Sequence, residues 1–260
     1  MSPGEDIGAA IRAAMARGAP ALVAYLTAGF PTRAGFRAHV AAVSGAADVI
    51  EIGVPFTDPM ADGVTIQRAS LAALAQGVTL GWILGELAAL PALGPPRLLM
   101  SYLNPLLAFG IERLAESAAR AQVSGFIVPD LPLDESAELR AGLNTRGLAL
   151  VQLATPVTGP ERLAALAAVS QGFLYAVTMT GTTGRNVAVP DSVLGYLDRV
   201  RAVSPVPVSA GFGIRSREQV ERLAGHVDGV IVGSALVEVL ERGEDPAAWL
   251  GKLRAGAPNP

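Results

Sequence analysis

Eight short runs of apolar residues recur along the chain, and each is the length of a single strand. A strand that is covered on both faces carries a continuous apolar run, as is typical of parallel sheets. Most of the runs begin 20 to 30 residues after the previous one. The runs are ALVAYLT (21–27), DVIEIG (48–53), RLLMSY (97–102), GFIVPD (125–130), LALVQLA (148–154), GFLYAVT (172–178), PVPVSAG (205–211) and DGVIVGS (228–234).

Segments rich in Ala, Leu, Arg and Glu separate these runs and show helical spacing. Eight strands that alternate with helices predict a (β/α)8 TIM barrel. We expect one barrel domain over residues 1–260, with an extra N-terminal helix and insertions in the loops that follow strands. The long interval after the second run predicts extra helices around 64–76 and 79–90. The other predicted helices are Arg33–Val43, Ile111–Gln122, Ser136–Leu143, Pro160–Val169, Asp191–Val203 and Glu218–Leu223.

An open, doubly wound parallel sheet is the alternative architecture. Such a fold usually carries the spacing GxGxxG directly after its first strand. The corresponding segment here, LTAGFPTRAG, lacks that spacing, so the barrel is favoured.

Composition excludes several classes of protein. The chain has no cysteine, which rules out disulfides, thiol nucleophiles and iron–sulfur clusters. Its net charge of −3 gives no basic footprint for nucleic acid. The longest uncharged stretch, 163–184, is broken by Ser170-Gln171-Gly172, which favours a helix end, a turn and a strand over a membrane span. Because Glu5 and Asp6 stand where a signal peptide would be basic, we expect a cytoplasmic protein.

Catalysis in a barrel takes place at the carboxyl ends of the strands and in the loops that follow them. The two histidines and the only lysine are badly placed for it. His39 falls in a predicted helix, His226 precedes the eighth strand, and Lys252 lies in the last helical segment. Chemistry that depends on a Schiff-base lysine or on histidine is therefore disfavoured.

The second run carries the first catalytic candidate. In VIEIG the alternation of a strand places Glu51 on the same face as Val49 and Gly53, with the two isoleucines opposite. The isoleucines suit the helix-covered face, so Glu51 points into the barrel. Burial raises the pKa of a carboxyl group toward values useful for acid–base catalysis. A structural ion pair with an inward arginine is the alternative reading.

The loop that follows, VPFTDPMADG, carries Asp58 and Asp62. Two carboxylates on the catalytic face could act beside Glu51. The alternative is turn chemistry, because aspartate commonly stabilises turns and helix ends.

Glycine-rich turns follow the last three strands: TGTTG (180–184), AGFGIRS (210–216) and VGSAL (232–236). In barrels the loops after strands seven and eight often bind phosphate together with a helix N-terminus. Gly213, Gly233 and Ser234, supported by Gly184, are the predicted donors. Ordinary strand-to-helix turns are the alternative reading. Together with Glu51, these turns indicate carboxylate acid–base chemistry on a phosphorylated substrate.

The segment VIEIGVPFTDPMADGVTIQ (49–67) closely resembles the signature of the tryptophan synthase alpha subunit family. The similarity extends along nearly the whole chain, through LTAGFP (26–31), SYLNPLLAFG (101–110), PDLPLDES (129–136), TGTTG (180–184), SAGFGI (209–214) and VGSA (232–235). The resemblance implies a lyase of tryptophan biosynthesis that cleaves indole-3-glycerol phosphate to indole and glyceraldehyde 3-phosphate by retro-aldol chemistry. It implies no cofactor in this chain, and a pyridoxal-phosphate beta subunit as partner in an αββα tetramer.

The resemblance also assigns roles. It makes Glu51 the acid/base, and Asp62 the carboxylate that accepts a hydrogen bond from the indole N–H. Tyr175 would lie beside the reacting substrate, and Thr183 would meet Asp62 when a mobile loop closes. Gly184, Gly213, Gly233 and Ser234 would bind the phosphate. The chain departs from the family at Phe30, Met179 and Thr182, and Asp58 with segments 101–110 and 129–136 would face the partner.

Two alternative functions stay open at this point. The chain could be a stand-alone indole-3-glycerol-phosphate lyase that needs no beta subunit. It could also be a mainly non-catalytic activating partner, although such a protein has no need to keep both Glu51 and Asp62.

Overall fold

The structure, a computed structural model, describes residues 2–91, 94–178, 189–211 and 213–254. Within these ranges eight parallel strands pair in chain order and close into a barrel. The closure excludes the open sheet, because the first strand pairs with the last. The strands are β1 (Ala21–Thr27), β2 (Val49–Gly53), β3 (Arg97–Met100), β4 (Gly125–Ile127), β5 (Ala149–Ala154), β6 (Leu174–Val177), β7 (Val208–Gly211) and β8 (Gly229–Val232). The predicted (β/α)8 barrel is confirmed.

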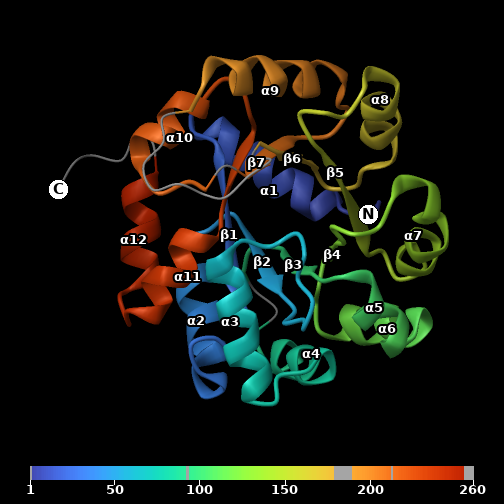
Figure 1. Cartoon of the computed structure of the whole chain (residues 1–260), viewed down its shortest axis with the longest axis vertical. Helices are drawn as coiled ribbons and strands as arrows, with labels where there is room; N and C mark the ends of the chain where they lie inside the picture. The colour runs from blue at the N-terminus through green and yellow to red at the C-terminus, as the bar shows by residue number, and fades with distance from the viewer. Residues whose placement is uncertain (1, 92–93, 179–188, 212, 255–260) are drawn as a thin grey trace.

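Helices surround the strands (Figure 1). The two extra helices predicted after the second strand are present as α3 and α4. One short helix, α5, was not predicted; Gly110, with a φ of +89°, separates it from α6. The helices are α1 (Glu5–Ala16), α2 (Phe36–Ser44), α3 (Val64–Ala75), α4 (Leu80–Ala88), α5 (Leu103–Phe109), α6 (Ile111–Arg120), α7 (Ala137–Asn144), α8 (Pro160–Val169), α9 (Asp191–Val203), α10 (Arg217–Leu223), α11 (Ser234–Glu241) and α12 (Pro246–Leu253), with 3-10 turns at Arg33–Gly35 and Leu133–Glu135.

Local sequence explains where several helices begin. The Thr79 side chain accepts a hydrogen bond from the Trp82 N–H and so caps α4. Asp245 caps α12 in the same way, directly before a proline in the first turn. Ser216 and Gln219 form a capping box at the start of α10. Each cap satisfies N–H groups that have no partner within the helix.

The core has two layers, because successive side chains along each strand point alternately out of and into the barrel. Outward side chains such as Ile50 and Ile52 pack under the helices. Inward side chains such as Val49 fill the barrel, where they meet Ile7 and Ile11 of α1. Figure 1 shows α1 inside the ring of the other helices. The predicted N-terminal helix is therefore present and closes the amino-terminal end of the barrel, which leaves the carboxyl end open.

Among the described residues no single helix is long and apolar enough to cross a membrane. One bent pair, α3 with α4, meets the limits of length and composition, with an angle of 86° at its break.

Candidate active site

Glu51 occupies the middle of β2 and points into the barrel, as its position in VIEIG predicted. Its side chain is buried, and one carboxylate oxygen, Oε2, has no hydrogen-bond partner. Burial raises the pKa of Glu51 to about 8, and the nearby charge of Asp62 adds to the rise. Glu51 is therefore mostly protonated at neutral pH, so it is able to donate a proton.

The alternative reading of Glu51, an ion pair with an inward arginine, is wrong for the described part of the chain. None of the ion pairs there involves Glu51. Arg97, the only arginine within the described strands, begins β3 and donates from its guanidinium to the Pro91 carbonyl at 2.7 Å. An uncompensated buried carboxyl group costs stability, and such a cost is common at functional sites.

Asp62 lies in the loop between β2 and α3. Burial raises the pKa of Asp62 to about 6, and a hydrogen bond from Tyr102 partly opposes the rise. The Ala61 N–H donates to the same Tyr102 hydroxyl at 2.8 Å, and the Asp62 carbonyl accepts from the Gln67 side chain at 2.8 Å. The Tyr102 ring stacks on Phe56, with 5.2 Å between the centroids. These contacts hold the Asp62 carboxyl group in place.

Asp58, the other aspartate of this loop, lies apart from Glu51 and Asp62. Its carboxylate accepts a hydrogen bond from the neighbouring Thr57 hydroxyl at 2.6 Å, and its side chain is exposed. It does not line the cavity described below, whereas Asp62 does.

Two tyrosines stand beside Glu51 on the inner wall. Tyr25 pairs with Glu51 across the β1–β2 ladder, and its hydroxyl lies 3.3 Å from the Thr27 hydroxyl. Tyr175 projects from β6. Burial raises the pKa of both phenols, and the two carboxyl groups raise it further, so both keep their protons as hydrogen-bond donors.

Two inward glycines make room for these rings. A Cβ atom added at Gly53 would lie 2.1 Å from the Tyr25 hydroxyl, and one added at Gly211 would lie 2.7 Å from that of Tyr175. Both distances are shorter than any real contact. A side chain at either position would therefore displace the tyrosine.

A cavity of about 1120 Å³ opens at the carboxyl end of the barrel and joins these groups. All six predicted site residues that the structure describes line it: Glu51, Asp62, Tyr175, Gly213, Gly233 and Ser234. The remaining two, Thr183 and Gly184, lie outside the described residues, as do Met179 and Thr182. None of His39, His226 and Lys252 lines the cavity, in agreement with the sequence.

One end of this cavity is built from backbone. Gly213 has a φ of +66°, a conformation that side chains strongly disfavour. Gly233 directly precedes α11, and Ser234 is the first residue of that helix. The first N–H groups of a helix have no partner within it and attract an anion. This end of the cavity therefore suits a phosphate group.

Sequence reasoning missed Tyr25, Tyr102 and the space-making role of Gly53 and Gly211. Strand alternation alone could have placed Tyr25 on the inward face of ALVAYLT. No local sequence pattern indicates the contact between Tyr102 and the Asp62 loop, because the two segments lie about 40 residues apart in the chain. Among the described residues no group of three His, Cys, Asp or Glu side chains could hold a metal ion.

Comparison with known proteins decides the family. The family model described as tryptophan synthase alpha chain matches residues 11–256. The chain belongs to the tryptophan synthase alpha chain family. It is 48% identical over 242 residues to the tryptophan synthase alpha chain of Nitratidesulfovibrio vulgaris, an alignment that covers 92% of this chain and 94% of that protein. It is 41% identical to that of Streptomyces avermitilis, with 97% and 92% covered.

Solved structures of tryptophan synthase support the same family assignment. A structure of Mycobacterium tuberculosis tryptophan synthase matches with a TM-score of 0.88 and 38% identity, covering 95% of this chain and 96% of that one. The alpha subunit of Legionella pneumophila matches with a TM-score of 0.85 and 31% identity, covering 95% and 96%. The tryptophan synthase alpha chain family catalyses carbon–carbon lyase cleavage of indole-3-glycerol phosphate in tryptophan biosynthesis, so the predicted family and enzyme class are confirmed. The family works with a beta subunit, to which pyridoxal phosphate belongs.

Proposed function

We propose that this chain cleaves indole-3-glycerol phosphate to indole and glyceraldehyde 3-phosphate, with Glu51 as acid/base and Asp62 as the charge-stabilising carboxylate. One observation carries the proposal. Glu51 and Asp62 line the same cavity as the phosphate-suited turns at Gly213 and Gly233. A substrate with an aromatic ring at one end and a phosphate at the other fits a site whose reactive and anion-binding parts are separate.

Glu51 both donates the proton that starts the reaction and accepts the proton released at its end. The protonated carboxyl group gives its proton to indole C3, which leaves a positive charge spread to the ring nitrogen. The bond from C3 to the first glycerol carbon then breaks, and its electron pair restores the aromatic ring. The hydroxyl group on that carbon becomes the aldehyde and returns a proton to the Glu51 carboxylate. No net proton is consumed, and no cofactor in this chain takes part in these steps.

Asp62 acts on the charge that develops between these steps. As a carboxylate it accepts a hydrogen bond from the indole N–H and stabilises the positive ring. A fixed charge in a site that excludes water is most effective when it is aimed at charge that exists only in the transition state. The contacts of Tyr102 and Gln67 keep it there in advance. Tyr175 and Tyr25 remain protonated, so their hydroxyl groups are available to substrate oxygens and to the carboxylates.

The phosphate would lie between the turn at Gly213 and the first turn of α11, where Gly233 and Ser234 supply N–H donors. Thr183 and Gly184, which lie outside the described residues, would complete this end of the site.

The first prediction tests the function through its pH dependence. The purified chain releases indole from indole-3-glycerol phosphate, and a plot of kcat/KM against pH is bell-shaped. Activity needs Asp62 ionised and Glu51 protonated, so it rises through about pH 6 and falls through about pH 8. Because the two carboxyl groups interact, these limbs belong to the pair. Absence of indole release would overturn the proposed function, and an activity that keeps rising above pH 9 would overturn the role of Glu51 as acid.

We also propose a beta subunit as partner in an αββα tetramer. Three large apolar side chains, Met60, Leu107 and Val157, are at least half exposed, and all lie in segments that follow strands at the open end of the barrel. Assays with and without an added beta subunit separate the possibilities. Strong activation supports a true subunit. Unchanged activity favours a stand-alone lyase, and binding without lyase activity favours a non-catalytic partner.

A second prediction concerns the phosphate. Ser234→Asp places a negative charge at the start of α11, where it repels a phosphate dianion. We expect KM for indole-3-glycerol phosphate to rise at least about tenfold, while the protein keeps its fold because an acidic residue suits a helix N-terminus. Steady-state kinetics with Ser234→Ala as control measure the effect. An unchanged KM would place the phosphate elsewhere.

A further inference from the structure

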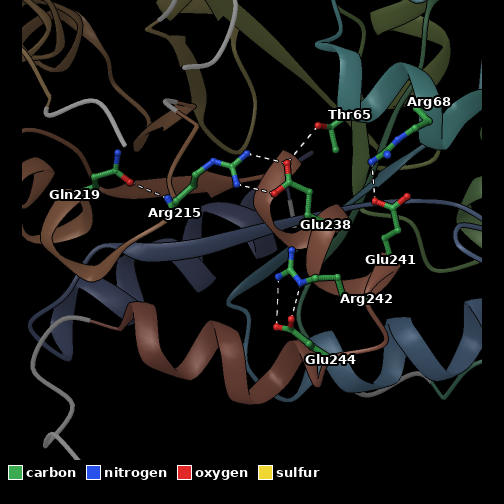
Figure 2. Close-up of polar contacts among 8 residues, drawn as sticks. All are labelled: Thr65, Arg68, Arg215, Gln219, Glu238, Glu241, Arg242 and Glu244. Carbon is green, nitrogen blue, oxygen red and sulfur yellow. Dashed lines mark hydrogen bonds and ion pairs between the residues drawn. The ribbon is translucent and has the colours of Figure 1, made fainter. Parts of the chain in front are cut away.

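An ion pair stands directly behind the phosphate end of the cavity. Arg215, two residues after Gly213, donates to both carboxylate oxygens of Glu238, at 2.7 and 2.9 Å (Figure 2). The two side chains are only 22% and 23% exposed. Neither residue lines the cavity. A bidentate pair shielded from water is stronger and more directional than an exposed surface pair, the kind that prevails among the ion pairs of the described residues.

The pair joins the two structures that would bind the phosphate. Glu238 stands four residues after Ser234 on α11, and residues four apart share one face of a helix. Arg215 belongs to the segment that begins at the Gly213 turn. The ion pair therefore fixes the distance between that turn and the helix whose first N–H groups face the cavity.

The backbone on the other side of Arg215 is also held. The Gln219 side chain accepts a hydrogen bond from the Arg215 N–H at 2.7 Å (Figure 2). It accepts a second from the Ser216 N–H at 3.2 Å. The bond from Ser216 belongs to the capping box at the start of α10. The segment after Gly213 is thus anchored to α10 through its backbone and to α11 through the Arg215 side chain.

Glu238 makes a further contact toward the catalytic loop. Thr65, three residues after Asp62, donates to it in a long hydrogen bond of 3.4 Å. Arg68 and Glu241 form a second pair between α3 and α11, at 2.6 Å. Figure 2 shows both links side by side. Of the two ion pairs described, the Arg215–Glu238 pair connects α11 to the Gly213 segment. The Arg68–Glu241 pair connects α11 to α3 and does not reach that segment.

We propose that Arg215 and Glu238 are positioning residues for the substrate phosphate, holding the Gly213 turn and the first turn of α11 at the separation at which their N–H groups converge on one phosphate. The proposal rests on the proposed function. The Arg215 side chain acts through the turn and does not touch the substrate. In the opposing hypothesis Arg215 binds the phosphate directly. The two hypotheses predict different effects of Glu238→Gln on KM.

The experiment compares Arg215→Ala, Glu238→Gln and Arg68→Ala with the parent chain. Kinetic constants for indole release, the inhibition constant of inorganic phosphate and the thermal unfolding midpoint are measured for each. We expect KM and the phosphate inhibition constant to rise together, about tenfold, in both Arg215→Ala and Glu238→Gln, with kcat within about twofold. Arg68→Ala is the matched control, because it removes an ion pair between α3 and α11 that does not reach the turn; its constants stay within about twofold of the parent. Arg215→Lys, which keeps a charge but not the bidentate contact, falls between parent and Arg215→Ala.

The outcomes separate the hypotheses. If Glu238→Gln lowers KM or leaves it unchanged while Arg215→Ala raises it, Arg215 binds phosphate directly and the proposal is overturned. If the variants only lower the unfolding midpoint, or if Arg68→Ala weakens phosphate inhibition equally, the pair is merely structural and the proposal again fails. A parent chain that releases no indole, or that phosphate does not inhibit competitively, overturns the proposed function as well.

Discussion

Glu51→Gln is expected to lower kcat for indole release by about 10²–10⁴-fold, the usual contribution of a positioned general acid–base group. Glutamine has nearly the same shape, so the substrate still binds and KM changes little. The amide can neither give a proton to indole C3 nor take one from the glycerol hydroxyl. Steady-state kinetics with and without a beta subunit measure the loss. Glu116→Gln makes the same chemical change on an exposed face of α6 and serves as control. Undiminished turnover in Glu51→Gln would remove Glu51 from the mechanism.

The same substitution is expected to stabilise the protein at alkaline pH. The pKa of Glu51 is raised from 4.5 to about 8 in the folded chain. Between these values the folded state holds a proton that the unfolded state has released, so the stability falls as pH rises through this window. Glutamine removes that loss. The gain in free energy of unfolding over the parent is therefore small near pH 5 and largest above about pH 8. Urea unfolding at both pH values checks it, and an equal gain at both would contradict the raised pKa.

Catalysis and stability thus oppose one another at a single side chain. Oε2 of Glu51 is buried without a hydrogen-bond partner, and the described residues offer it no counter-ion. Such an arrangement costs stability and persists where the surrounding fold is rigid enough to hold it. Here the rigidity comes from the closed barrel and from the apolar layer beneath the site, to which α1 contributes.

Alternation along one strand was enough to predict the position of Glu51. Its period of two residues is a property of any strand, and the two isoleucines of VIEIG identify the outer face. The late glycine turns were predictable for a similar reason, because a barrel brings the loops after neighbouring strands together. Both inferences needed only local sequence and the closure of the sheet.

The position of Asp62 could not be predicted in the same way. Sequence offered two aspartates in one loop, and turn chemistry fitted each of them. The structure separates them through Tyr102, whose hydroxyl meets the Ala61 N–H from the end of the next strand. The need for glycine at positions 53 and 211 likewise depends on tyrosines of neighbouring strands. Contacts of this kind require a register between strands, and no pattern within a single strand specifies it.

Asp62→Asn is expected to lower kcat/KM by about 10²–10³-fold, the usual loss when one preorganised electrostatic contact to the transition state is removed. The amide can still hydrogen-bond to Tyr102, so the loop keeps its place, but it carries no charge to oppose the positive indole ring. Asp58→Asn in the isolated chain is the matched control. It neutralises an exposed carboxylate of the same loop, four residues away, and leaves kcat/KM within about twofold.

The pH dependence of the residual activity of Asp62→Asn is also expected to change. Burial is the main cause of the raised Glu51 pKa, and the charge of Asp62 is the second. Removing that charge makes ionisation of Glu51 easier, so the alkaline limb of the pH profile moves to lower pH but stays above the ordinary value of a glutamate. The acid limb disappears, because only one carboxyl group of the pair is left to titrate. A profile of unchanged shape at reduced height would mean that the two carboxyl groups do not interact, and the shared site proposed for them would then be wrong.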